Sequence, residues 1–171
     1  EMAWINLSEE LFDITSQYTD TSDRYLLGRK PFEMMEGYWP NAGQKPDASK
    51  HDKEHSDWYN NVSKVVISKT LAGRSIPNSS VISRDLGGEI KKLKQSGGKD
   101  IITFGSPSAA HSLMELDLID EYGLFVNPVL LGKGIPAFSD ISKKLSLKLV
   151  ENKQLSSAVV FLLYRRNLTD Y

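Results

Sequence analysis

The sequence contains no cysteine, which excludes disulfide frameworks, thiolate metal sites and cysteine nucleophiles. It also has little net charge, -1 from 21 Lys and Arg against 22 Asp and Glu, and no cluster of basic residues offsets this balance. Nucleic acid is therefore not expected as a partner. No apolar run approaches the roughly 18 residues that a membrane span needs, and no signal peptide opens the chain. A soluble cytoplasmic protein is expected.

Short apolar strands alternate with helical patterns along the 171 residues, a length that suits one domain with a buried core. Four such strands are expected, at residues 25–27, 64–68, 80–83 and 101–104. Their alternation with helices predicts an α/β fold with a mostly parallel sheet covered on both faces. A long strand over 122–131 and an antiparallel pair at 145–150 and 158–164 should complete the sheet.

The strand at 101–104 ends abruptly in Gly105, Ser106 and Pro107. Ser106 is a suitable N-cap whose hydroxyl would accept a backbone N–H of the following helix, and Pro107 would be the first helical residue. A glycine at this position lets an anion approach bare N–H groups where the helix dipole also favours negative charge. The junction is therefore a candidate phosphate site, although similar turns also occur where nothing is bound.

Two further strand ends carry groups that could hold phosphate. They are Gly28-Arg29-Lys30, a second strand–glycine–helix junction, and Ser68-Lys69-Thr70. A solvated turn is an equally open interpretation of Arg29 and Lys30. Ligands of open α/β sheets bind outside the carboxyl ends of the strands, so these groups together with Gly105-Ser106 suit a dinucleotide. The G-x-G-x-x-G fingerprint is missing, so an ordinary dinucleotide-binding domain of that type is not expected.

The composition becomes polar over residues 36–61, which predicts a mobile loop followed by a short exposed helix at 47–59. This segment contains His51-Asp52-Lys53-Glu54-His55, which matches an inverted zinc-protease pattern. On a helix the two histidines would share a face, as zinc ligands must. Nearly every neighbour is charged or polar, however, whereas a catalytic zinc helix is seated in a core by apolar residues. No metal is therefore expected.

Several segments of the chain together resemble the dihydrofolate-reductase-like family, which includes the reductase domain of bacterial riboflavin biosynthesis. The segments are residues 102–106, 116–122 and 127–134 with Phe138, supported by residues 27–30, 68–70 and 81–83. The resemblance covers nearly the whole chain. It implies a three-layer fold with antiparallel C-terminal strands, and a homodimer for which the apolar C-terminal strands could supply the surface.

The resemblance also implies an NADPH-dependent reductase that passes hydride to a C=N or C=O group of a small pterin- or pyrimidine-like substrate. A dinucleotide-binding module without catalysis is the alternative, because fold alone does not settle activity. The residues that the family pattern assigns to NADPH are Gly28, Arg29, Lys30, Ser68, Lys69, Thr70, Gly105 and Ser106.

The amino-terminal part of the chain departs from the family pattern. In dihydrofolate reductase an acid early in the first helix, soon after a tryptophan and a leucine, anchors the pterin; Glu10 matches by its spacing from Trp4 and Leu7 with a one-residue gap. A surface role beside the helix dipole is the alternative. The family begins with an apolar strand and an aspartate-glycine loop, and neither stands before Glu1. We therefore expect the single domain 1–171 to lack a central strand and the purified polypeptide to be heavier than 19.2 kDa.

Overall fold

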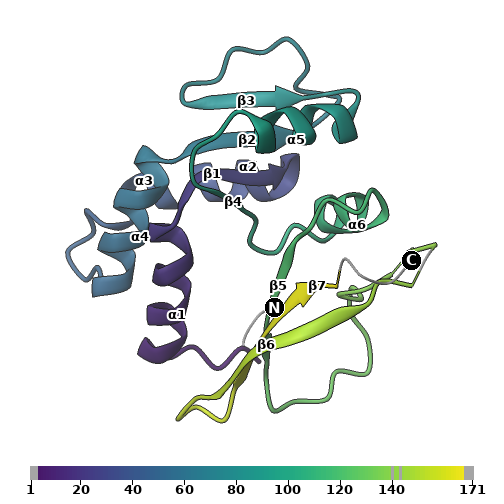
Figure 1. Cartoon of the computed structure of the whole chain (residues 1–171). Helices are drawn as coiled ribbons and strands as arrows, with labels where there is room; N and C mark the ends of the chain where they lie inside the picture. The colour runs from purple at the N-terminus through teal and green to yellow at the C-terminus, as the bar shows by residue number, and fades with distance from the viewer. Residues whose placement is uncertain (1–3, 140, 143, 168–171) are drawn as a thin grey trace.

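The computed structural model describes residues 4–139, 141–142 and 144–167 (Figure 1). Helices and strands alternate over most of this length. In chain order they are α1 (Glu9–Asp20), β1 (Ser22–Gly28), α2 (Arg29–Glu36), α3 (Trp39–Ala42), α4 (Lys50–Asn61), β2 (Ser63–Ile67), β3 (Ser79–Ile82), α5 (Leu86–Gln95), β4 (Asp100–Ile102), α6 (Pro107–Glu115), β5 (Glu121–Val126), β6 (Leu147–Gln154) and β7 (Val160–Arg166). None of the helices in the described ranges is long and apolar enough to cross a membrane.

The first four strands form a parallel sheet in the order β3-β2-β1-β4. Successive side chains of its central strand β1 point to opposite faces, because a strand has a period of two. Tyr25 and Leu27 pack with α2 and α4 on one face, whereas Leu26 packs with Ile90 of α5 on the other. The prediction of an α/β fold with a parallel sheet covered on both faces is therefore confirmed.

The last three strands form a separate antiparallel sheet in the order β5-β7-β6. The antiparallel arrangement agrees with the expectation, but these strands do not complete the parallel sheet. The strand expected over 122–131 ends earlier, at Val126. Asn127 and Pro128 follow it, and proline cannot donate a ladder hydrogen bond.

Helix α1 joins the two sheets. Leu11 and Ile14 on one face of α1 share a core with Leu155, Val159 and Phe161 of the antiparallel part. At its other end the helix runs into β1 of the parallel sheet, as Figure 1 shows. The two parts of the molecule are therefore tied together along one side by a single helix.

Residues 36–61 are more regular than the expected mobile loop. Helix α4 begins at a capping box in which Ser49 and Asp52 bond reciprocally to each other's backbone N–H. Tyr59 of this helix is fully buried and its hydroxyl donates to Glu36 at 2.8 Å. The expected helix is present, at Lys50–Asn61, but only one of its faces is exposed, because its aromatic side chains lie on the other face and pack against β1.

Candidate functional site

The three sequence-predicted groups lie at one edge of the parallel sheet. Gly28, the last residue of β1, is in register with Ile67 of β2, so Ser68 follows directly beside it. Strand β4 flanks β1 on the other side, and Gly105 follows its carboxyl end. The carboxyl ends of three adjacent strands therefore present all of these groups together, at the edge where α/β proteins bind ligands.

A buried hydrogen bond joins two of these strand ends. The backbone N–H of Gly28 donates to Oγ of Ser106 at 2.9 Å, and Ser106 is only 4 % exposed. The hydroxyl of Ser106 does not cap α6, so that part of the prediction was wrong. Ser106 is in the left-handed region at φ 52°, and its side chain meets β1 instead of the helix. A Cβ at Gly28 would lie 3.0 Å from this Oγ, so any larger residue there would have to displace the Ser106 hydroxyl.

The glycine turn before α6 leaves open space above the backbone. Gly105 has φ +61°, and a Cβ placed on it would meet nothing within 4 Å among the described atoms. Helix α6 begins at Pro107 as predicted. Its first-turn N–H groups have no intrahelical partners and carry the positive end of the helix dipole. The turn therefore fits a phosphate group, which could approach the backbone closely.

The basic residues follow the carboxyl ends of the two neighbouring strands β1 and β2. Arg29 and Lys30 are exposed in the first turn of α2, and Arg29 forms an ion pair with Glu33 at 3.6 Å. Lys69 is exposed in the turn after β2. Ser68 is buried, and its Oγ accepts from the N–H of Leu71 at 3.2 Å. Ser68 therefore shapes the turn that presents Lys69.

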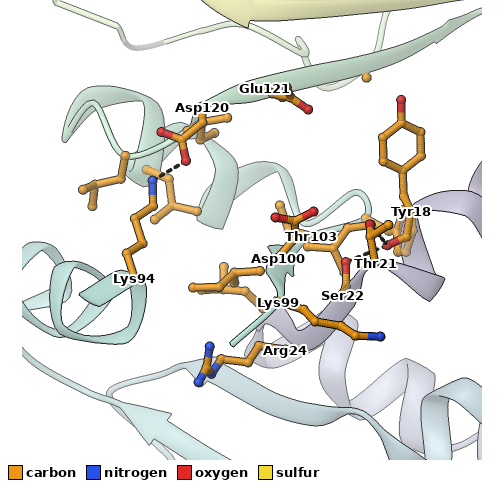
Figure 2. Close-up of a pocket in the computed structure, with 18 of the residues that line it drawn as sticks. Tyr18, Thr21, Ser22, Arg24, Lys94, Lys99, Asp100, Thr103, Asp120 and Glu121 are labelled. Carbon is orange, nitrogen blue, oxygen red and sulfur yellow. Dashed lines mark hydrogen bonds and ion pairs between the residues drawn. The ribbon is translucent and has the colours of Figure 1, made fainter. Parts of the chain in front are cut away.

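A cleft of about 770 Å³ lies between β4 and β5, and its carboxyl end is formed by Thr103, Phe104 and Gly105. The same cleft therefore adjoins the glycine turn. Figure 2 shows Thr103, Arg24 and Lys94 among the residues that line this cleft. The Oγ1 atom of Thr103 is buried without a hydrogen-bond partner among the described residues.

An aromatic cluster stands behind Phe104. The ring of Phe104 contacts Trp58 and His55 of α4, and the ring centroids are 6.2 Å apart in both pairs. His55 also packs on Trp39 at 4.2 Å, and His51 stacks on Phe12 of α1 at 3.8 Å with an interplanar angle of 8°. These rings connect α1 and α4 to the end of β4.

The two histidines act as neutral aromatic groups in this cluster. Burial lowers the pKa of His55 to about 4, and burial also lowers the pKa of His51. No group of three His, Cys, Asp or Glu side chains suited to a metal ion occurs in the described part of the chain. Sequence reasoning missed this cluster because it counted the histidines as polar; His51, His55 and Trp58 recur at the i, i+4, i+7 spacing of a packed helical face.

Glu10, in the first turn of α1, is held by the turn that joins β6 and β7. Its carboxylate accepts from the backbone N–H of Ser156 at 2.7 Å and from the hydroxyl of the same residue, in the turn between β6 and β7. These hydrogen bonds lower the pKa of Glu10. The contact holds the start of α1 against the antiparallel sheet, and the catalytic role of Glu10 stays a prediction.

Comparisons with known proteins place this geometry in a family. The profile described as the RibD C-terminal domain matches residues 1–161. The chain belongs to this family. Membership confirms the resemblance drawn from the sequence, and it supports a reductase of the dihydrofolate-reductase-like superfamily.

Individual relatives agree with this assignment. The chain is 33 % identical over 153 residues to the uncharacterized protein YyaP of Bacillus subtilis, a match that covers 89 % of this chain and 78 % of that protein. A putative riboflavin biosynthesis protein from Shewanella sp. PV-4 has the same fold, with a TM-score of 0.67, 17 % identity and coverage of 95 % of this chain and 81 % of that one. Dihydrofolate reductase from Enterococcus faecalis, solved with NADP(H), matches with a TM-score of 0.56 and 16 % identity over 91 % of this chain and 81 % of the enzyme.

Proposed function

We propose that this protein is an NADPH-dependent reductase that transfers hydride to a C=N or C=O group of a small pterin- or pyrimidine-like molecule. The observation that carries the proposal is the hydrogen bond from Gly28 N–H to Ser106 Oγ. It joins two strand–glycine–helix junctions into one surface at the carboxyl edge of the sheet. One junction offers open backbone, and the other places basic residues beside it.

The residues divide into two groups by the part of the cofactor that they suit. Gly105, Ser106 and the first turn of α6 suit the pyrophosphate, because the backbone there is open and the helix dipole favours an anion. Arg29, Lys30 and the Ser68-Lys69-Thr70 turn suit the ribose 2′-phosphate. Bound NADPH would supply the hydride, and the protein would supply placement and electrostatics.

Phe104 offers a wall for the substrate. Phe104 lines the cleft directly before Gly105, and its ring packs against Trp58 and His55 of α4. A planar heterocycle could lie against such a wall with little reorganisation of the protein. His55 stays neutral at physiological pH, so it adds no charge to the ring environment.

Thermal unfolding with NADPH and with NADH tests the cofactor. A ligand at about 100 times its dissociation constant stabilises the folded state by roughly 2.7 kcal/mol. We expect a raised midpoint with NADPH and a smaller rise with NADH. Arg29→Ala should weaken NADPH binding about tenfold with little effect on NADH, since one lost phosphate contact is worth about 1.4 kcal/mol. Lys91→Ala, an exposed cation on α5, is the matched control. No shift with either dinucleotide would contradict the proposal.

A dinucleotide-binding module without turnover is the second candidate, and the position of Glu10 favours it. The carboxylate that the family pattern assigns to catalysis is hydrogen-bonded to Ser156. Turnover assays with dihydrofolate and with a ribosylaminopyrimidine separate the two functions. For a reductase that uses this acid, Glu10→Gln should lower kcat at least tenfold while NADPH binding is kept. NADPH binding without turnover of either substrate by the wild-type protein would favour the module.

We also propose that the chain forms a homodimer through β6. This strand is at the edge of its sheet, and all eight of its residues are exposed. Leu147, Leu149 and Val150 give it exposed apolar surface. Unpaired edge strands are templates for pairing with another chain, so a second copy could cover this one.

A further inference from the structure

The carboxyl edge of the parallel sheet gathers basic side chains. Arg29, Lys30 and Lys69 follow β1 and β2, and the exposed Arg84 follows β3, the next strand of the sheet. Arg29 pairs with Glu33. Lys30, Lys69 and Arg84 have no carboxylate partner among the described residues. This side of the candidate site is therefore positive and suits the phosphates of a dinucleotide.

Helix α1 carries the opposite charge. It meets α4 through the stack of Phe12 on His51, and so borders the aromatic cluster around Phe104. It contains no basic residue, and its acids are Glu9, Glu10, Asp13 and Asp20. The carboxylates of Glu9 and Asp13 are exposed and form no hydrogen bond or ion pair within the described part of the chain. The amino-terminal half of α1 is therefore an uncompensated negative surface.

Helix α4 adds further carboxylates, those of Asp52, Glu54 and Asp57. Of its two lysines, Lys50 is paired with Glu54 at 3.8 Å. The exposed Lys53 lies two residues from both histidines of the helix and therefore points away from their face. Neither lysine thus offers an unpaired positive charge to the aromatic cluster.

The acids of the two helices act on the rings themselves. The pKa of His51 is lowered by burial, and three negative charges act against this shift, those of Asp52, Glu54 and Glu9. Asp52 acts in the same direction on His55, which contacts the ring of Phe104. The aromatic cluster is therefore bordered by carboxylates from both α1 and α4.

The basic residues that line the cleft do not offset this negative charge, because each has a partner within the chain. The pairs are Arg24 with Asp23, Lys94 with Asp120, Lys99 with the carbonyl of Asp20, and Arg165 with Glu121. A phosphate or carboxylate of a substrate would have to displace one of these partners or remain without a counter-charge. Both alternatives cost free energy.

Given the proposed reductase function, we propose that the substrate is a planar heterocycle that carries no phosphate or carboxylate, and that the acids of α1 and α4 select it by its charge. Ring faces attract neutral or protonated heterocycles, and neighbouring carboxylates strengthen the attraction for a cation. The same carboxylates repel an anion. The basic edge would thus take the phosphates of the cofactor, and the acidic side would take the uncharged or protonated ring of the substrate.

Binding of matched compounds to the protein loaded with NADP⁺ tests this charge selection without hydride transfer. One pair is a ribosylaminopyrimidine and its 5′-phosphate, and the other is 6-methyldihydropterin and dihydrofolate, which carries a glutamate. Quenching of the fluorescence of Trp39 and Trp58, both in the aromatic cluster, reports binding. The member without an anionic group should bind about ten times more tightly at low ionic strength. The ratio should shrink in about 0.5 M salt, because salt screens exposed charges.

Glu9→Lys tests whether the acids are the source of the preference. The substitution reverses one of the charges that act on His51, and it should lower the binding ratio of each pair about threefold or more. Asp20→Lys makes the same change of charge at the other end of α1 and is the matched control. Both positions are exposed, so both variants should fold, and Asp20→Lys should keep the ratio of the wild type.

Three results would overturn the charge selection. They are equal or tighter binding of the phosphorylated or carboxylated compounds at low ionic strength, a wild-type ratio in Glu9→Lys, and failure of all four compounds to bind. Repeating the titrations without NADP⁺ separates the result from cofactor binding. Compounds that bind with the expected preference but are not reduced by NADPH would contradict the proposed reductase and still support the selection by charge.

Discussion

The parallel and antiparallel sheets differ in how many of their faces are covered. The parallel sheet has a core on each face, one under α2 and α4 and the other under α5 and α6. The antiparallel sheet shares one core with α1, and its edge strand β6 is exposed along its whole length. Antiparallel sheets tolerate one solvated face, whereas parallel sheets are normally buried on both.

The candidate cofactor edge and the exposed edge strand lie on different sheets. The candidate cofactor edge belongs to the doubly covered sheet, in which a central strand fixes the position of Gly28 and a buried hydrogen bond holds Ser106 beside it. The singly covered sheet has an exposed edge strand, to which the proposed dimer contact belongs. Since α1 packs against both, substitutions should affect stability, ligand binding and assembly differently in the two sheets.

The largest expected effect is a cavity in the doubly covered sheet. Leu27 on β1 is 0 % exposed, and Leu27→Ala should lower the free energy of unfolding by about 2–5 kcal/mol because it leaves a cavity in a packed core. Urea unfolding of the dilute protein measures this. Leu149→Ala on β6, where the side chain is 45 % exposed, should change stability by no more than about 0.5 kcal/mol. Similar losses for both would remove the distinction between the sheets.

The next effect is a pH dependence that originates in the aromatic cluster. The pKa of His55 is about 4 in the folded protein and 6.5 in the absence of structure. As pH falls through 6.5 the unfolded state gains a proton first, so stability present above this pH is lost progressively toward pH 4. The loss should approach roughly 3 kcal/mol.

Unfolding of His55→Phe between pH 7 and 4 checks this prediction. The variant should lack the loss that is due to His55, and its stability should fall less steeply than that of the wild type. His111→Phe on α6 keeps His55 and should retain the steeper dependence. Parallel pH curves for His55→Phe and the wild type would mean that the cluster accommodates a charged imidazole.

A smaller effect is expected from the hydrogen bond at the cofactor edge. Ser106→Ala leaves the N–H of Gly28 buried without its acceptor, which should cost about 1–3 kcal/mol of stability. NADPH affinity should fall in parallel, as measured by the ligand-induced shift of the melting midpoint. Ser112→Ala, an exposed serine further along the same helix, is the control. A wild-type midpoint and ligand shift in Ser106→Ala would show that this contact does not hold the edge together.

The smallest effect on monomer stability is expected at β6. Leu149→Lys should convert the proposed dimer to a monomer in light scattering coupled to size exclusion, while the unfolding free energy of the dilute chain changes by no more than about 0.5 kcal/mol. Lys148→Gln on the same strand keeps the apolar residues and should remain dimeric. A monomeric wild-type protein at micromolar concentration would rule out the dimer.

Local patterns in the sequence determined the order of the elements and the place of the candidate site. Alternation of apolar strands with helices specified the parallel sheet, since its strands are buried on both faces and read as continuous apolar runs. The two glycine junctions, at Gly28 and Gly105, were visible because glycine, N-cap and proline signals act within a few residues. The common edge followed from the parallel direction of the strands.

Tertiary structure decided the features that depend on residues distant in the sequence. Ser106 is a helix cap by its local sequence, but its hydroxyl accepts from Gly28, 78 residues away. Glu10 bonds to Ser156, 146 residues away, and no local signal identifies that partner. Burial, rather than residue type, makes His55 a neutral member of an aromatic core. The cleft between β4 and β5 likewise exists only once two sheets are placed side by side, because an unpaired strand edge is a property of the assembled fold.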